Sequence, residues 1–410
     1  MQTPDEVVAA LARSAAAAAE SLAEARDEQV SAGLAAMARR LSEARDELAA
    51  ANERDVEAAR SGGMSSALLD RLRLGPERLD ELAANLRLLA ETAPMVREVP
   101  IRDLEDGLVL IERRRPVGVI GVNYEARPNV TIDVASQLLK SRNAGVLRTG
   151  SAAIGSALAL HRHVIAPALE EAGLDPDAVQ IVGEPGHEYA FALVRQPGLI
   201  RLAILRGSGE TTAALGAEAA AHGVRTLAHA EGGGVLFVDA AADEATLRRL
   251  LRQGTDRLGV CNRVNLVLVG EQAADRFEPV VREVLGELGI TVDEAPFDHP
   301  VGHEWALDDG HEATVSLLRV ADELAAARVA NTETSGLAAT IVTEDAQTAR
   351  RFLDRYVGTG AFWNATTRLL DGFKLLAVPE TGINVDHMPG PRGPVTFADL
   401  YLRQYLVRPA

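Results

Sequence analysis

The stretch DRLGVCNRVNLVLV, residues 256–269, contains the only cysteine of the chain. A helical run at 244–253 ends at Gly254, a short loop follows, and the apolar run at 264–269 is typical of a buried strand. Cys261 lies at the end of that loop. A thiol in this position is held by rigid structure and can still be reached, which suits a nucleophile. The alternative is that a lone cysteine is an inert, buried small hydrophobe.

The composition is that of a globular protein with room for two or three domains, at 410 residues, 47% hydrophobic and 25% charged. The formal net charge of −17 disfavours nucleic acid and anionic membranes as partners. We see no apolar run long enough to cross a bilayer and no signal-peptide pattern at the N-terminus. A single cysteine cannot form an intrachain disulfide, so we expect a cytoplasmic protein.

The basic and metal-binding side chains narrow the chemistry further. Lysine occurs only at Lys140 and Lys374, so nearly all positive charge is arginine. Arginine recognises carboxylate and phosphate through its planar fork but cannot act as a base. The histidines show no metal-ligand spacing beyond His161-x-His163, which falls on a predicted amphipathic helix, so we expect no metal site.

Strands and helices alternate along most of the chain. Residues 3–60 predict one or two long helices. From Pro116 on, strands are predicted with helices between them at 117–122, 144–148, 179–182, 200–205 and 224–227. This alternation predicts a doubly wound parallel sheet. A second α/β unit begins near residue 231, and the segment 293–311 is acidic and irregular, as in a surface loop.

Two further segments predict a separate β element. Residues 108–111 read as a strand within an arm at 101–115, and residues 400–407 read as a strand near the C-terminus. A terminal strand needs a partner edge. We expect this arm, in the same chain or in a second subunit, to provide it.

The turns after the predicted strands contain candidate binding residues. Arg148 and Ser151 flank a strand end and would suit a ribose phosphate, and the Gly207–Gly209 turn would let a pyrophosphate approach closely. Arg127 is near a helix N-terminus that we expect Asn129 to cap. The alternative is an ordinary turn or helix cap in each case. The residues alone favour that alternative at Arg127 and Asn129, and the two readings are about even at Gly207–Gly209.

Six short stretches point to one family when they are taken together. They are LLDRL (68–72), RRRPVGVIG (113–121), YEARPNVTIDVA (124–135), CN (261–262), NATTR (364–368) and RGP (392–394). In this combination the chain resembles the gamma-glutamyl phosphate reductases, also called glutamate-5-semialdehyde dehydrogenases, of the aldehyde dehydrogenase superfamily. The likeness extends, with gaps, over most of the chain.

The resemblance implies an α/β fold of aldehyde-dehydrogenase type in three parts. These would be a Rossmann-type NADP-binding domain with N-terminal helices (1–100, 116–228 and 365–390), an α/β catalytic domain (229–364) and a small β oligomerisation flap (101–115 and 391–410). It also implies a homo-oligomer, either a dimer or a tetramer.

The activity implied by the resemblance is one step of proline biosynthesis. Cys261 would attack the acyl phosphate of L-glutamyl 5-phosphate, and phosphate would leave a thioester on the enzyme. Hydride from NADPH would then give L-glutamate 5-semialdehyde. The preference for NADP over NAD is left open.

The same resemblance suggests roles for individual residues. The backbone N–H of Cys261 and the amide of Asn129 would stabilise the oxyanion. The cofactor would be held by Arg148, Ser151, Gly207, Ser208 and Gly209, and Glu380 would contact the nicotinamide ribose. We assign Arg127, Asn262 and Arg368 to the substrate.

Three positions depart from the family pattern, all in the expected catalytic domain. They are Leu337-Ala338-Ala339, Asn265-Leu266 and Gly234-Val235, where the family has more polar or reactive residues. Losing polar groups that read a charged substrate would weaken its binding, because buried charges would be left unpaired. The departures therefore suggest an altered substrate pocket.

Two alternatives follow from this pattern. The same thiol and cofactor could serve a different acyl phosphate or an aldehyde, and Glu231 could then be a general base for water-dependent oxidation. The chain could also be a scaffold that kept the fold without catalysis.

Overall fold

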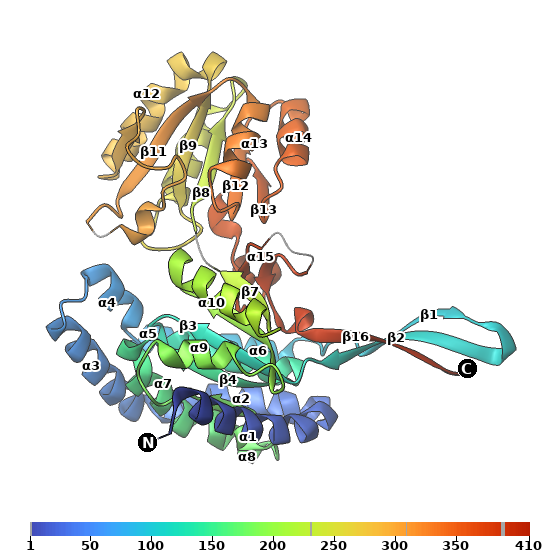
Figure 1. The fold of residues 1–410 in the computed structure, drawn as a ribbon. Coiled ribbons are helices and arrows are strands. Elements are labelled where there is room, and N and C mark those ends of the chain that lie inside the picture. Colours follow the sequence, from blue (N-terminus) through green and yellow to red (C-terminus); the bar gives the residue numbers. More distant parts are fainter. Residues whose placement is uncertain (1, 230–231, 309, 387–389) are drawn as a thin grey trace. The chain divides into compact units, whose positions relative to one another are not determined.

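The computed structural model describes residues 2–229, 232–308, 310–386 and 390–410 (Figure 1). Contacts between residues divide the chain into two compact units. Unit 1 comprises Met1–His229, Ala377–Ile383 and Val395–Ala410, and unit 2 comprises Ala230–Leu376 and Asn384–Pro394. Residues 365–376 and 384–386, which we expected in the cofactor domain, and residues 391–394, which we expected in the flap, lie in unit 2.

Unit 1 begins with a set of helices: α1 (Pro4–Glu24), α2 (Asp27–Glu43), α3 (Arg45–Ser61), α4 (Ser66–Leu72) and α5 (Pro76–Glu91). Three helices, where one or two were expected, therefore cover residues 3–60. The first break occurs at Arg26, whose extended backbone starts α2 with its N–H bonded to the Gln29 side chain. On α1, small apolar side chains recur at three- and four-residue spacing and are buried.

The main sheet of unit 1 is parallel and has the strand order β5-β4-β3-β6-β7. Its strands are β3 (Val119–Tyr124), β4 (Ala144–Thr149), β5 (Val179–Ile181), β6 (Ile200–Arg206) and β7 (Arg225–His229). The helices between them are α6 (Pro128–Ser141), α7 (Ile154–Leu160), α8 (Ala166–Glu171), α9 (Glu188–Val194) and α10 (Gly209–Ala221). Every residue of β3 and β4 is buried, as expected for a sheet covered on both faces. The doubly wound prediction is confirmed.

One helical segment of unit 1 is longer and more apolar than we expected, since the sequence showed no run that could cross a bilayer. The segment Ser151–Glu171, which includes a π-helical turn at His161–Ile165, is long and apolar enough to cross a membrane, and half of it is buried. Its side chains Leu160, Val164 and Leu169 belong to the core of unit 1. It therefore has the character of a core helix.

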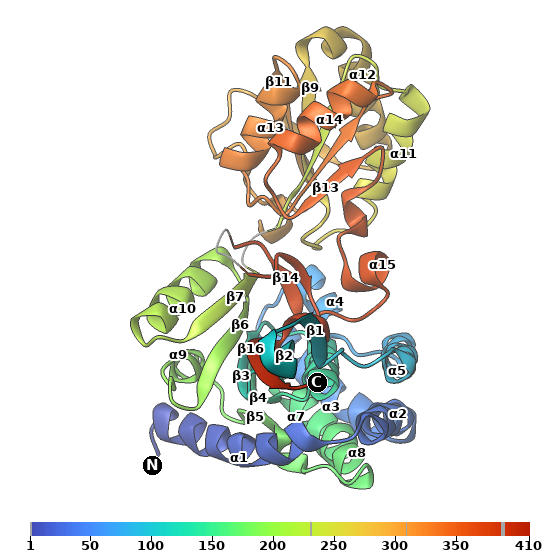
Figure 2. The ribbon, with the colours of Figure 1, turned by 90° about the vertical axis from the view of Figure 1, so that its right-hand side faces the viewer.

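The central sheet of unit 2 is also parallel, with the order β10-β11-β9-β8-β12-β13. Figure 2 labels β9, β11 and β13 of this sheet. Its strands are β8 (Gly234–Val238), β9 (Val264–Gly270), β10 (Thr291–Glu294), β11 (Thr314–Val320), β12 (Ala338–Val342) and β13 (Gly360–Trp363). The helices are α11 (Glu244–Gly254), α12 (Glu271–Glu287), α13 (Glu323–Thr332), α14 (Ala346–Arg355) and α15 (Gly372–Leu376).

Alternating side chains of the unit 2 strands build two cores. On β8, Leu236 and Val238 pack with α11 and α12, whereas Val235 and Phe237 pack with α13 and α14. Strands buried on both faces in this way need helices on both sides. A two-stranded sheet of β14 (Gly382–Asn384) and β15 (Gly393–Val395) completes the fold of the chain.

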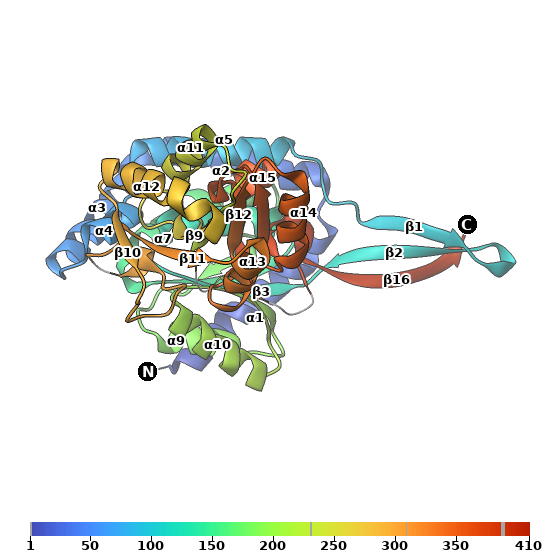
Figure 3. The same ribbon diagram turned by 90° about the horizontal axis from the view of Figure 1, so that it is seen from above.

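The arm and the C-terminal segment form a three-stranded antiparallel sheet of β1 (Glu98–Asp103), β2 (Leu108–Pro116) and β16 (Tyr401–Pro409) (Figure 3). The pairing of β16 with β2 runs from Tyr401 opposite Pro116 to Pro409 opposite Leu108. The two predicted strands therefore pair within one chain. Strands β1 and β16 are the edges of this sheet.

Candidate active site

Cys261 ends the loop between α11 and β9, as the helix–loop–strand pattern predicted. The loop contains Gly259 with a φ of 68°, a left-handed conformation that favours glycine. Cys261 is half-buried. The residue is therefore not sealed in the hydrophobic core, and its thiol meets the first requirement of a nucleophile.

The backbone of the thiol loop is fixed by the start of β8. Gly233 N–H donates to the Cys261 carbonyl at 2.7 Å, and Gly234 N–H donates to the Arg263 carbonyl at 2.6 Å. A Cβ added to Gly234 would lie 2.8 Å from Thr367 Oγ1, so only glycine fits without movement. These bonds set the loop rigidly against the sheet.

Two residues assigned to the substrate, Asn262 and Arg368, contact each other beside the thiol. Asn262 Nδ2 donates to the Leu370 carbonyl at 3.0 Å, and Arg368 Nη1 donates to Asn262 Oδ1. Arg368 Nε also donates to Asp256 Oδ1 at 2.8 Å. The pair thus ties both ends of the thiol loop to the segment after β13. The third assigned residue, Arg127, belongs to unit 1.

Arg263 is directed into the core and away from solvent. It is 2% exposed, and Nη1 donates to the Thr314 carbonyl at 3.0 Å. Burial lowers the pKa of its guanidinium to about 10. Arg263 is therefore part of the support beneath the loop.

The three departures from the family pattern meet at one edge of the sheet. Gly234 is opposite Val264 on one side and Ala338 on the other. All three strands are parallel and start here, so the departures lie at the amino edge of the sheet, next to the thiol loop. Leu337, Ala338 and Ala339 are buried in the core.

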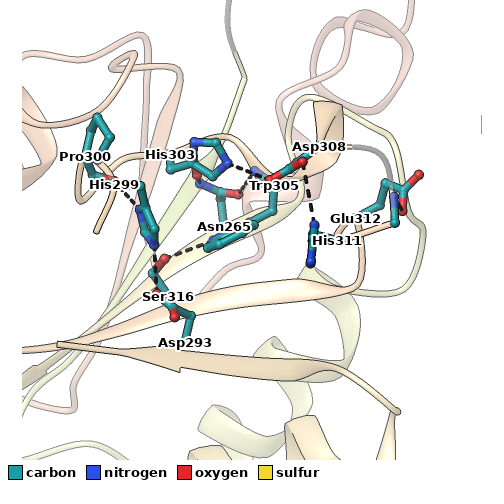
Figure 4. A network of polar contacts seen from close by, with 11 residues as sticks. Asn265, Asp293, His299, Pro300, His303, Trp305, Asp308, His311, Glu312 and Ser316 are labelled. Carbon is teal, nitrogen blue, oxygen red and sulfur yellow. Dashed lines mark hydrogen bonds and ion pairs between the residues drawn. The ribbon is translucent and has the colours of Figure 1, made fainter. Parts of the chain in front are cut away.

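Asn265, at one of these departures, has a polar role that the sequence analysis did not identify. Its Oδ1 accepts a hydrogen bond from Trp305 N–H at 3.1 Å, and its Nδ2 donates to the His303 carbonyl (Figure 4). Between these residues, Glu304 Oε2 accepts from Gly232 N–H at 2.7 Å. Glu231, the candidate general base, lies outside the described residues.

The side chains of His299, His303 and His311 lie close to Trp305 in the same loop (Figure 4). His299 Nε2 lies 2.9 Å from Asp293 Oδ2, and His303 Nε2 lies 3.1 Å from Asp308 Oδ2. Burial lowers the pKa of His299, but hydrogen bonds to the Pro300 carbonyl and the Asp293 carboxylate raise it more, so the net shift is upward. Within the described ranges, no group of such side chains has the arrangement of a metal site.

In unit 1, the candidate cofactor residues follow strands whose carboxyl ends share one edge. The strand order reverses between β3 and β6, and ligands of doubly wound sheets bind at such a switch point. The Gly207–Ser208–Gly209 turn directly follows β6, and Ser208 caps α10 by accepting from Thr211 N–H. Arg148 is near the carboxyl end of β4, beside β3, and Ser151 follows that strand.

Arg148 and Asn129 already have protein partners. Arg148 is buried and donates to Asn123 Oδ1 at 3.1 Å and to the Gly186 carbonyl at 2.7 Å, and burial lowers the pKa of its guanidinium. The expectation that Asn129 caps a helix is wrong. Helix α6 starts earlier, with Pro128 in its first turn, so Asn129 is inside the helix and donates to Asp133 at 3.2 Å.

His229, at the end of β7, shows that several charged groups gather at this edge. Burial and the nearby charges of Arg206 and Arg127 lower the pKa of His229 to about 3. Arg206 Nη1 also donates to the carbonyl of Thr381, the residue after Glu380. The edge therefore brings together Arg127 and the segment that contains Glu380. Sequence reasoning missed His229, and its place at the end of a strand was the available signal.

Comparison with known proteins identifies the family. The aldehyde dehydrogenase family model matches residues 1–302. The gamma-glutamyl phosphate reductase of Leifsonia xyli subsp. xyli is 37% identical over 374 residues, covering 88% of this chain and 87% of that protein. The chain belongs to the gamma-glutamyl phosphate reductases of the aldehyde dehydrogenase family.

Solved structures agree with this membership of the gamma-glutamyl phosphate reductases. The crystal structure of the Thermotoga maritima gamma-glutamyl phosphate reductase has a TM-score of 0.88 and 27% identity, with 98% of each chain covered. A propionaldehyde dehydrogenase from Clostridium phytofermentans has a TM-score of 0.72 at 15% identity, over 96% of this chain and 95% of that chain. The second likeness shows the fold alone.

As a member of this family, the protein is an oxidoreductase that acts on an aldehyde with a nicotinamide cofactor and a small-molecule substrate. The family resemblance and the α/β fold expected from the sequence are confirmed. The alternatives of a different substrate and of a non-catalytic scaffold are not favoured.

Proposed function

We propose that the protein reduces L-glutamyl 5-phosphate to L-glutamate 5-semialdehyde and phosphate, with NADPH as reductant, as a cytoplasmic step of proline biosynthesis. The observation that carries the proposal is a half-buried Cys261 on a braced loop at the amino edge of the unit 2 sheet. The relative from Leifsonia xyli, whose name specifies this activity, aligns over most of the chain.

The chemistry centres on the sulfur of Cys261. The thiolate attacks the acyl carbon, and the carbon–oxygen bond to phosphate breaks with its electron pair leaving on phosphate. Sulfur suits the step because it is a strong nucleophile and later a good leaving group. The nicotinamide cofactor supplies the hydride when it is bound. Cys261 is released when the carbon–sulfur bond breaks to give the aldehyde.

Donors for the oxyanion are the Cys261 N–H and the Asn129 amide. Asn129 uses one of its two N–H groups on Asp133, which leaves the other for a ligand. Asn262 and Arg368 serve the substrate side by fixing the loop next to the sulfur, and Arg127 adds positive charge that attracts an anionic ligand.

The cofactor is held by Arg148, Ser151 and the Gly207–Gly209 turn, with Glu380 at the nicotinamide ribose. Their place at the carboxyl edge of a doubly wound sheet, beside a switch point, supports this assignment. The start of α10 directs backbone N–H groups at this edge, which favours a pyrophosphate.

The three-stranded sheet is the oligomerisation flap of a dimer or tetramer. Its edge strands β1 and β16 have backbone groups available for pairing, and the apolar residues Ile101, Leu402, Tyr405 and Val407 are exposed. A second copy of the chain would cover them.

A steady-state assay tests the proposed reaction in reverse. The purified protein, given glutamate-5-semialdehyde, NADP⁺ and phosphate, should form NADPH at a rate that depends on all three. The Cys261→Ala variant should show no such rate. Steady NADPH formation that is independent of phosphate would contradict the proposal, and a comparison of NADP⁺ with NAD⁺ determines the cofactor.

A further inference from the structure

Asn265 uses both ends of its side-chain amide to hold one loop. Oδ1 accepts from the Trp305 N–H at 3.1 Å, and Nδ2 donates to the His303 carbonyl. These are the two peptide groups on either side of Glu304. Asn265 lies on β9, shortly after the thiol, and is 4% exposed. The backbone of Glu304 is therefore fixed from both sides by a buried residue of the central sheet.

The Glu304 carboxylate is in turn a neighbour of the Cys261 backbone. Oε2 accepts from Gly232 N–H at 2.7 Å. A Cβ placed on Gly232 would lie 2.5 Å from Glu304 Oε1 and 2.6 Å from Cys261 Cα. Glu304 and Cys261 therefore both lie against Gly232, and a side chain at position 232 would not fit between them.

Hydrogen bonds hold the peptide groups of the turn at Gly232 and Gly233. Ser335 Oγ donates to the Gly232 carbonyl at 2.8 Å, and Gly233 N–H donates to the Cys261 carbonyl at 2.7 Å. With the bond from Gly232 N–H to Glu304, hydrogen bonds at this turn connect the carboxylate to the backbone carbonyl of Cys261. The loop that carries Glu304 is braced further by Trp305 Nε1, which donates to Ser316 Oγ on β11 at 2.9 Å (Figure 4).

We propose that Glu304 is a positioning residue for the Cys261 nucleophile and that Asn265 holds it in place. The inference rests on the proposed function of Cys261. Through Gly232, the carboxylate fixes the turn that supports the Cys261 carbonyl. We expect removal of its negative charge to favour the thiolate, because a nearby negative charge opposes ionisation of a thiol.

Two charged groups beside the thiol, Arg263 and Arg368, have fixed partners, and Arg257, in the thiol loop itself, is exposed. The buried guanidinium of Arg263 donates to the Thr314 carbonyl, and Arg368 is bonded to Asp256 and Asn262. Residue 231 lies outside the part of the chain that the structure describes. Changing Glu304 therefore removes one charge and leaves these contacts in place.

Alkylation of Cys261 by iodoacetamide tests the proposal directly, because the chain has no other cysteine. The rate is measured against pH for the wild type, Glu304→Gln, Asn265→Ala and the double variant. Glu304→Gln keeps an acceptor oxygen and removes the charge, so the midpoint of the rate profile should fall by about half to one pH unit. Asn265→Ala should shift it in the same direction, because the loop no longer holds the carboxylate. The double variant should add little to either shift.

The control is Glu312→Gln, which removes a carboxylate from the same loop. Glu312 accepts from Gly310 N–H at 3.0 Å, so this variant should leave the midpoint unchanged. A midpoint that stays at the wild-type pH in Glu304→Gln would overturn the proposal. So would a folded Asn265→Ala protein with a wild-type midpoint. Glu304→Gln alters a half-buried loop residue by one atom, so its result stands even if Asn265→Ala does not fold.

The kinetic readout separates positioning from binding. Glu304→Ala should lower kcat about tenfold or more and leave KM for NADPH unchanged, whereas Glu304→Gln should recover most of kcat. Equal losses in both variants would contradict a role through the hydrogen bond to Gly232. Because alkylation needs neither substrate nor cofactor, it remains decisive even if the proposed reaction fails.

Discussion

Arg368 donates a hydrogen bond from Nη1 to Oδ1 of Asn262, the residue that follows the thiol. The same guanidinium donates a hydrogen bond from Nε to Asp256 Oδ1 at 2.8 Å. One planar side chain therefore connects both ends of the thiol loop. Lysine cannot replace it, since an ammonium lacks the fork that reaches two acceptors in one plane.

We expect Arg368→Ala to lower kcat/KM at least about tenfold, because Asn262 loses a charge-assisted hydrogen bond and the loop loosens. Arg368→Lys should restore little of the loss. The control is Arg351→Ala, which removes an exposed arginine that pairs with Glu323 at 2.6 Å and should not change the activity. Full activity in Arg368→Lys would contradict this prediction, because it would show that a positive charge at position 368 is enough for activity.

Gly234→Ala should destabilise unit 2. The added Cβ would lie 2.8 Å from Thr367 Oγ1 and 2.9 Å from the Arg263 carbonyl, and the backbone there cannot give way easily. The expected loss is about 1–3 kcal/mol in the free energy of unfolding, measured by urea denaturation. Gly286→Ala on α12 is the matched control, because its Cβ would meet nothing within 4 Å. It should be neutral or stabilise the protein by up to about 1 kcal/mol.

The Gly207 turn can be tested without disturbing the fold. An added Cβ would lie 3.6 Å from Thr212 Oγ1, which is ordinary contact, so Gly207→Ala should fold normally. The methyl group would keep a pyrophosphate from approaching the backbone, and KM for NADPH should rise about tenfold. Gly216→Ala, within α10 and in open space, should leave KM unchanged. An unchanged KM in Gly207→Ala would place the pyrophosphate elsewhere.

The pair of His299 and Asp293 should make stability depend on pH. Because the pKa of His299 is raised in the folded protein, its contribution is present below the unfolded value of about 6.5 and is lost as pH rises through the folded pKa. His299→Gln should therefore cost stability at pH 5.5 and little at pH 8.5. The pair is partly exposed, so the cost should stay below about 1 kcal/mol. A larger cost at pH 8.5 than at pH 5.5 would contradict this sign.

Much of the fold could be predicted because its signals are local. The buried strand at 264–269, the βα alternation and the pairing of the arm with the C-terminal strand all follow from short apolar patterns. The break at Arg26 was missed, since a run rich in alanine and glutamate looks continuous until a capping contact is known. Strand β11 and helix α13 were also missed, because they follow an acidic segment that looked like loop.

The candidate site was less predictable because it depends on contacts distant in sequence. Cys261 could be found from its own stretch. Asn265 looked only like a departure from the family pattern, and Glu304 lay in a segment expected to be surface loop. The structure links them through hydrogen bonds that no spacing along the chain reveals.

The most direct test of the central claim is a single-turnover experiment with glutamate-5-semialdehyde and NADP⁺ in the absence of phosphate. We predict a burst of NADPH close to one equivalent per active chain and a thioester that mass spectrometry locates on the peptide containing Cys261. Adding phosphate should then release the adduct and restart turnover. NADPH formation in Cys261→Ala, or a burst without an adduct on that peptide, would contradict the account.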